Sequence, residues 1–176
     1  SYVLVLGAYY KLQTFLYLTA NGVVQGMRPL VGYNYGAGEW KRVQKIFKSA
    51  LGIIVTVMAL GTILCMWMPQ NLIGLFTENA ETIRIGCRAL RIISIGFAVS
   101  SVSVTVSGAL EGLGKGKESL VLSMLRYILV MLLLAVVFSH FWQADGVWHA
   151  FWVTEGIVAV ISYLMYHKWM GAEKEE

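Results

Sequence analysis

One carboxylate stands alone in a long apolar stretch near the end of this sequence. Glu155 is the only acidic residue between Val147 and Tyr166. An ionisable group in such surroundings is costly unless it is neutral or paired, and it is a functional candidate by default when the stretch spans a membrane. Glu155 is therefore a candidate for binding an ion or a cationic ligand. The alternative is a purely structural hydrogen bond between helices.

A second candidate region is the segment from Gln25 to Gly38, where the first apolar run ends. Pro29 lacks the N–H that a helix interior needs, and its ring clashes with the preceding turn, so we expect a kink or a local opening there. Gly32 and Gly36 allow the backbone to approach a neighbour closely. The segment has the composition of a helix end that bends or gates.

Polar side chains surround this predicted kink. Arg28 and Asn34 bracket it, and Gln25 lies one turn before Pro29. An opened membrane helix exposes backbone groups that can bind a polar ligand or line a gate, and interfacial anchoring is the alternative for these side chains. Lys11 interrupts the preceding apolar run; it either faces the pathway or extends its amine to the membrane surface.

The elements that position these residues are long apolar runs. The chain has 176 residues, of which 57% are hydrophobic and 14% charged, with a mean hydropathy of +0.65. Soluble domains carry about 25% charged residues, so we expect an all-α, polytopic membrane bundle that has the lipid bilayer as its partner. Five transmembrane spans are predicted, at about residues 3–27, 49–68, 92–110, 120–141 and 147–166.

The distribution of basic residues predicts the orientation of the spans, because Lys and Arg are enriched in cytoplasmic loops. Basic residues follow the first, third and fifth spans: Lys41, Arg42, Lys45, Lys48, Lys115, Lys117 (with Arg126 close by), Lys168 and Lys174. The tail 167–176 is thus expected to be cytoplasmic, and 70–91 an outer interfacial connection. Arg84, Arg88 and Arg91 in that connection are a real exception to the rule.

Other kinds of site find no support in the sequence. The glycine-rich stretch from Gly112 to Ser119 lacks the spacing of a phosphate-binding loop, and no HExxH or Ser-His-Asp arrangement is present. Cys65 and Cys87 flank the predicted outer connection and are expected to be free packing residues rather than a disulfide. We therefore expect no enzyme, no metal site, no organic cofactor and no nucleic-acid partner.

The segment QGMRPLVGYNYGAG (Gln25–Gly38), followed by a basic loop, resembles the eighth helix of the multidrug and toxic compound extrusion (MATE) family. Three further segments resemble later parts of the family pattern: Met68–Ile92, Ser107–Lys117 and Asp145–Glu155. The resemblance implies helices eight to twelve of a twelve-helix transporter, which is most of one six-helix lobe. The N-terminal lobe and helix seven would then be missing partners of this fragment.

The resemblance also implies a function. It predicts a secondary active exporter in the plasma (inner) membrane, which moves cationic or amphipathic organic compounds by antiport with H⁺ or Na⁺ through alternating access. Some sodium-coupled members have an acidic residue in the middle of helix ten, whereas Ile92–Leu110 has none. The principal carboxylate is thus expected in the missing lobe, with Glu155 as the alternative. Other readings are a lipid-linked saccharide flippase of related build, or a membrane scaffold or enzyme subunit.

Overall fold

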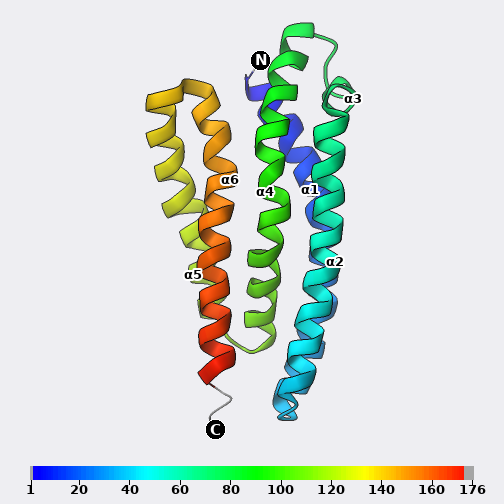
Figure 1. Cartoon of the computed structure of the whole chain (residues 1–176), viewed down its shortest axis with the longest axis vertical. Helices are drawn as coiled ribbons and strands as arrows, with labels where there is room; N and C mark the ends of the chain where they lie inside the picture. The colour runs from blue at the N-terminus through cyan, green and yellow to red at the C-terminus, as the bar shows by residue number, and fades with distance from the viewer. Residues whose placement is uncertain (1, 173–176) are drawn as a thin grey trace.

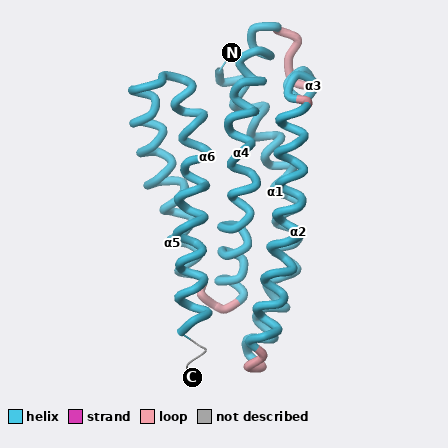
Figure 2. Tube along the Cα trace, in the orientation of Figure 1, coloured by secondary structure: helices cyan, strands magenta, loops and turns pink. Residues whose placement is uncertain are grey.

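The computed structural model describes residues 2–172 and shows an elongated bundle of helices joined by short loops (Figures 1 and 2). The helical segments are α1 (Tyr2–Gly36), α2 (Trp40–Trp67), α3 (Pro69–Gly74), α4 (Ala80–Gly112), α5 (Gly116–Met124), the π-helical segment η1 (Leu125–Met131) and α6 (Leu132–Ala172). The described residues contain no strand. The predicted all-α class is confirmed.

The last helix in this order turns back on itself. Trp142 and Gln143 leave the helical conformation, and Gln143 has a φ of 51°. The chain therefore forms two antiparallel arms, which we call the first arm (116–141) and the second arm (144–172), and the reversal joins them at the upper end of Figure 1. Gly146 makes the tight turn possible, because a side chain there would collide with the carbonyl of Phe138.

Helix α4 is the centre of the bundle. It packs against α1, α2, α3 and the second arm. Its small polar residues are buried, and their hydroxyls donate to backbone carbonyls three residues earlier: Ser100 Oγ donates to the Phe97 carbonyl at 2.8 Å, and Ser103 Oγ to the Ser100 carbonyl at 2.9 Å. Small residues let membrane helices approach closely. This explains why the serine-rich segment becomes the helix with the most neighbours.

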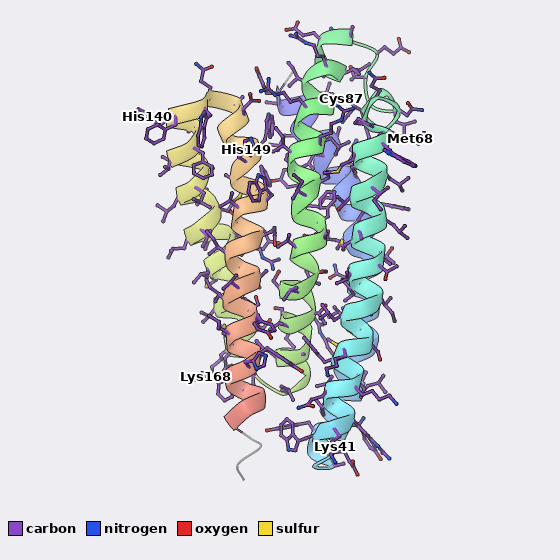
Figure 3. All side chains as sticks on the ribbon, viewed as in Figure 1. Lys41, Met68, Cys87, His140, His149 and Lys168 are labelled. Atoms are coloured by element: carbon purple, nitrogen blue, oxygen red, sulfur yellow. The ribbon has the colours of Figure 1, made fainter. Side chains whose placement is uncertain are left out.

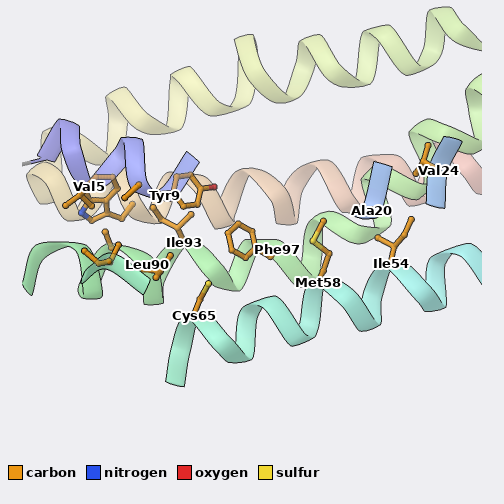
Figure 4. Close-up of a cluster of buried hydrophobic side chains, with 14 residues drawn as sticks. Val5, Tyr9, Ala20, Val24, Ile54, Met58, Cys65, Leu90, Ile93 and Phe97 are labelled. Carbon is orange, nitrogen blue, oxygen red and sulfur yellow. The ribbon is translucent and has the colours of Figure 1, made fainter. Parts of the chain in front are cut away.

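Two apolar clusters surround this helix. The larger one joins α1, α2, α3 and α4, and includes Val5, Ile54, Met58 and Phe97 (Figure 4). Cys65 is buried in the same cluster, and both cysteines are free, as expected. The smaller cluster lies nearer the α1–α2 turn and includes Met27 and Phe47. Together they hold α1, α2 and α4 as one unit.

Glycines bring α1 and α4 into backbone contact. A Cβ atom on Gly112 would lie 2.9 Å from the carbonyl oxygen of Arg28, and one on Gly32 would lie 3.0 Å from the carbonyl oxygen of Gly112. The close approach expected at Gly32 is thus present. Gly36 ends α1 but faces open space.

The sequence predicts a kink or a local opening at Pro29; the helix does not open there, and the kink stays a prediction. α1 runs through Pro29 without leaving the helical conformation and ends at Gly36, and the chain then turns at Gly38, which has a φ of 73°. Proline removes one backbone hydrogen bond, but membrane helices tolerate this loss where neighbouring helices hold them in place. The packing of α1 on α4 around Gly32 provides that support.

Three stretches in the described chain are long and apolar enough to cross a membrane: Trp40–Trp67, Ala80–Gly112 and Gly116–Trp169, the last comprising both arms. α1 is long enough but less apolar.

The basic residues near Lys41 and Lys168 lie at one end of the bundle, whereas Met68, Cys87 and His140 lie at the other (Figure 3). We call these the Lys41 end and the α3 end. Lys174 and the last residues of the predicted tail lie outside the described residues.

Candidate functional site

A cavity of about 320 Å³ lies between α1, η1 and the second arm. Aromatic rings and polar groups line it together: Tyr10, Gln13, Thr14, Tyr17, Leu18, Asn21, Arg126, Tyr127, Met131, Phe151, Thr154 and Glu155. Apolar walls with a few convergent polar groups are typical of small-molecule sites. Glu155, the residue that the sequence singled out first, is therefore part of a cavity wall.

Glu155 faces a buried cation. Arg126 Nε lies 3.8 Å from Glu155 Oε2, and the two side chains are only 10% and 16% exposed. This distance is an ion-pair contact but too long for a hydrogen bond. Arg126 Nη2 also donates a hydrogen bond to Ser103 Oγ on α4. Within residues 2–172, Arg126 Nε and Glu155 Oε2 have no hydrogen-bond partner. The pair can therefore donate one further hydrogen bond from Arg126 and accept one at Glu155.

The local fold brings the two charges together. Arg126 belongs to η1, and π-helical segments are rare features that often occur at functional sites. Glu155 lies on the second arm, which approaches α4 closely at Gly96. A Cβ atom on Gly96 would lie 3.2 Å from Trp152 Cα and 3.5 Å from Glu155 Cγ. A larger residue at this position of α4 would push the carboxylate away from its place.

Polar contacts continue from the cavity into α4. Tyr17 Oη donates to Ser100 Oγ at 2.7 Å, which connects α1 with α4. Thr154, the neighbour of Glu155, returns its hydroxyl to the Ala150 carbonyl at 2.7 Å. Phe151 packs edge-on against Tyr9, with ring centroids 5.3 Å apart. These hydrogen bonds fix the hydroxyls of Tyr17 and Thr154, and the ring of Phe151 supplies an aromatic part of the cavity wall.

This arrangement can bind a cation or a proton. A carboxylate oxygen without a hydrogen bond is a ready acceptor, and aromatic rings attract organic cations through their faces. The neighbouring arginine opposes this, because it already partly neutralises the carboxylate. A ligand that carries positive charge must therefore compete with Arg126 for Glu155.

The other predicted site residues do not join this cavity. Arg28 Nη2 lies 2.5 Å from Glu111 Oε2 near the Lys41 end, and Arg28 Nη1 donates to Gln25 Oε1 at 3.4 Å. Asn34 Nδ2 donates to the Leu30 carbonyl at 2.8 Å, on the side of α1 that faces α2. The ammonium of Lys11 lies 5.5 Å from the centre of the Phe76 ring at the α3 end.

Sequence reasoning missed Arg126 as a site residue. It was counted with the basic residues that follow the third span, because it lies in the first turns of the fourth. A signal was available, since Arg126 and Glu155 are opposite charges inside consecutive apolar spans. Such charges tend to pair within the bundle rather than face lipid.

Comparison with known proteins gives the same picture. The family model MatE matches residues 3–137. Multidrug export protein MepA of Staphylococcus saprophyticus is 23% identical over 159 residues, which is 90% of this chain and 35% of the relative. MepA of Staphylococcus aureus (strain NCTC 8325) is 23% identical over 163 residues, again 90% of this chain and 35% of the relative. The chain thus spans about a third of these relatives' length.

Solved structures share the fold. An outward-facing multidrug resistance MATE family transporter matches with a TM-score of 0.93 and 20% identity, covering 99% of this chain and 40% of that one. An inward-facing structure of the same description matches with a TM-score of 0.90 and 17% identity, covering 97% of this chain and 40% of that one. A transporter of the same superfamily from Pyrococcus furiosus matches with a TM-score of 0.91 and 19% identity, covering 97% of this chain and 39% of that one. With its motif, its bundle and a family match over most of its length in agreement, this chain belongs to the MatE family of multi-pass membrane transporters.

Proposed function

We propose that this chain forms most of one lobe of a secondary active multidrug exporter, which moves cationic or amphipathic organic compounds outward in exchange for H⁺ or Na⁺. The observation that carries the proposal is the Arg126–Glu155 pair, buried at 3.8 Å in a cavity with aromatic walls. A cation from either side of the antiport can bind the same carboxylate. Ion and substrate then bias one two-state equilibrium, so the ion gradient drives export.

Alternating access by a rigid lobe is part of the proposal. The chain has nearly the same similarity to an outward-facing and to an inward-facing transporter, with TM-scores of 0.93 and 0.90. This is expected if the lobe keeps its shape while it moves relative to the rest of the transporter. We place the Lys41 end and the C-terminus on the cytoplasmic side of the plasma membrane, following the basic residues there.

The cavity favours this function over a lipid-linked saccharide flippase. A phosphate-bearing substrate needs excess positive charge in the cavity. Arg126 is the one cationic side chain among the cavity residues described, and Glu155 offsets it. Lys11, the other candidate cation, lies against Phe76 instead.

The test is ion-driven efflux of a cationic dye from vesicles that hold the full-length transporter, comparing wild type with Glu155→Gln. We expect the variant to lose efflux by at least about tenfold, which corresponds to about 1.4 kcal/mol. Glu78→Gln is the matched control, because Glu78 is exposed in the α3–α4 loop and makes no ion pair among the described residues.

Three outcomes have separate meanings. Loss of efflux in Glu155→Gln, with wild-type efflux in Glu78→Gln, supports the proposal. Full efflux in Glu155→Gln removes Glu155 from the cycle and returns it to a structural role. No ion-driven efflux of any cationic dye by the wild type contradicts multidrug export itself, and transport of a lipid-linked saccharide or a scaffold role would then be tested next.

A further inference from the structure

We propose that Arg84, Arg88 and Arg91 form a binding site for the phosphate of anionic lipids at the α3 end of the bundle. We call this group the arginine face. It lies on α4 and takes no part in the cavity or the export function proposed above. These are the same three residues that break the pattern of basic loops in the sequence.

The arginine face is built by helix geometry. Positions 84, 88 and 91 are four and three residues apart, so their side chains project from one side of α4. All three residues are exposed. Arg88 Nη2 lies 2.7 Å from Asp145 Oδ2, which fixes this guanidinium against the reversal between the two arms. Arg84 and Arg91 have no carboxylate within 4.0 Å in the part of the chain that the structure describes.

Grooves on both sides of these arginines provide room for a headgroup. One groove of about 560 Å³ contains all three, with Gln70 of α3 and Cys87 between them, and Ile83 and Ile92 on its apolar edges. A second groove of about 350 Å³ shares Arg84 and Arg88 and reaches Trp142 and Trp148 near the reversal. A charged groove with apolar edges fits a lipid, which presents phosphate and hydrocarbon together.

The arginine face lies at the depth of the phosphates. Arg91 directly precedes the uncharged run Ile92–Leu110. At about 1.5 Å per residue that run is about 28 Å long, close to the hydrocarbon thickness of about 30 Å. Arg91 therefore marks the boundary, and Arg84 lies about 10 Å beyond it along the helix. Trp67 and Trp142, 84% and 60% exposed, belong to the same end, where indoles prefer the headgroup region.

Phosphate is the chemistry that this surface recognises. The planar guanidinium group matches phosphate oxygens with two parallel hydrogen bonds. Neighbouring carboxylates do not neutralise the two free arginines, since Asp145 is bound to Arg88 and neither Glu78 nor Glu81 makes an ion pair within residues 2–172. The membrane supplies phosphate at this depth continuously, so we assign the site to a lipid rather than to a soluble anion.

The experiment uses the full-length transporter, purified in neutral detergent and titrated with phosphatidylglycerol or phosphatidylcholine, with bound lipid counted by native mass spectrometry. The test variant is R84Q/R91Q, which spares the Arg88–Asp145 contact. The matched control is K41Q/K45Q, which removes two exposed positive charges at the opposite end. A second readout is maleimide labelling of Cys87 in the groove, with buried Cys65 as the internal reference.

We expect phosphatidylglycerol to bind the wild type and to protect Cys87, and the affinity to fall about 25-fold in R84Q/R91Q, at about fivefold for each arginine. K41Q/K45Q should keep the wild-type affinity. Equal affinity in R84Q/R91Q, or equal protection of Cys87 by phosphatidylcholine, would overturn the proposal. Protection by inorganic phosphate at matched concentration would reassign the site to a soluble anion.

A charge-conserving variant guards against misfolding. Arg84→Lys with Arg91→Lys keeps both charges but loses the two-pronged hydrogen bonds, so its affinity should lie between those of wild type and R84Q/R91Q. Wild-type affinity in the lysine variant would also contradict recognition by guanidinium groups. Dye efflux is not needed for any of these readouts, so the lipid site stands or falls independently of the export function.

Discussion

The pair Arg28–Glu111 and the pair Arg126–Glu155 join the same kinds of side chain in opposite ways. Near the Lys41 end the charged atoms are 2.5 Å apart, the side chains are 36% and 35% exposed, and Ser119 Oγ donates to Glu111 at 2.8 Å. In the cavity the atoms are 3.8 Å apart, and the side chains are 10% and 16% exposed. The tight pair is found where water reaches it, and the loose pair is found where water is scarce.

We propose that this difference separates a structural contact from a functional one. Arg28 and Glu111 are close to each other and to further partners, although Arg28 Nε is itself unpaired among the described atoms. They fasten α1 to α4. Buried charges that do not reach hydrogen-bond distance are expensive to keep. This cost supports the proposal that the pair binds a third charged or polar group in the cavity.

The largest test of this comparison is to break the buried pair. Arg126→Gln leaves an uncompensated buried carboxylate, so we expect the free energy of unfolding to fall by about 3 kcal/mol. Adding Glu155→Gln should recover more than half of that loss, because no charge then remains unpaired. The measurement is reversible unfolding of the full-length transporter in mixed micelles. A double variant as unstable as Arg126→Gln alone would show that the two side chains are not coupled.

The next test concerns the close contact between α1 and α4 beside the Arg28–Glu111 pair. Gly112→Ala places a methyl group 2.9 Å from the Arg28 carbonyl oxygen, where the two backbones must separate. We expect a loss of about 1–3 kcal/mol, as in other overpacked cores, measured in the same micelles. Gly26→Ala is the control, because nothing lies within 4 Å of that position and helix propensity favours alanine. Equal behaviour of the two variants would contradict the close contact.

The smallest effect is expected at the exposed pair. Arg28→Gln and Glu111→Gln should each cost at most about 1 kcal/mol, since about a third of each side chain is exposed and water replaces the lost partner. A double-mutant cycle at low and high salt measures the coupling, which should shrink as salt rises. A coupling here as large as that between Arg126 and Glu155 would remove the distinction between the two pairs.

The apolar runs of the sequence predicted the helices well, but the sequence did not predict which side of each helix faces which neighbour. A lone carboxylate in an uncharged run identified Glu155, and the order of the residues around Gly-Tyr-Asn-Tyr-Gly identified the family. Hydropathy does not say which face of a helix meets which neighbour, so Arg126 was read as part of an adjacent basic turn. At Pro29 the local rule also allowed an opening that does not occur, because that rule ignores the support that α4 gives to α1.

The π-helical segment Leu125–Met131 has a consequence for how this cavity can change through evolution. A π-helical turn holds about one residue more than an α-helical turn. Deleting a single residue there would restore the α-helix with little rotation of the helix beyond it, because the deletion removes the extra residue that the wider turn accommodates. Arg126 and Met131, which lie near the two ends of this segment, would then still face the same cavity. A residue can therefore be gained or lost within this segment during evolution, which changes this part of the cavity lining without reorienting the rest of the first arm.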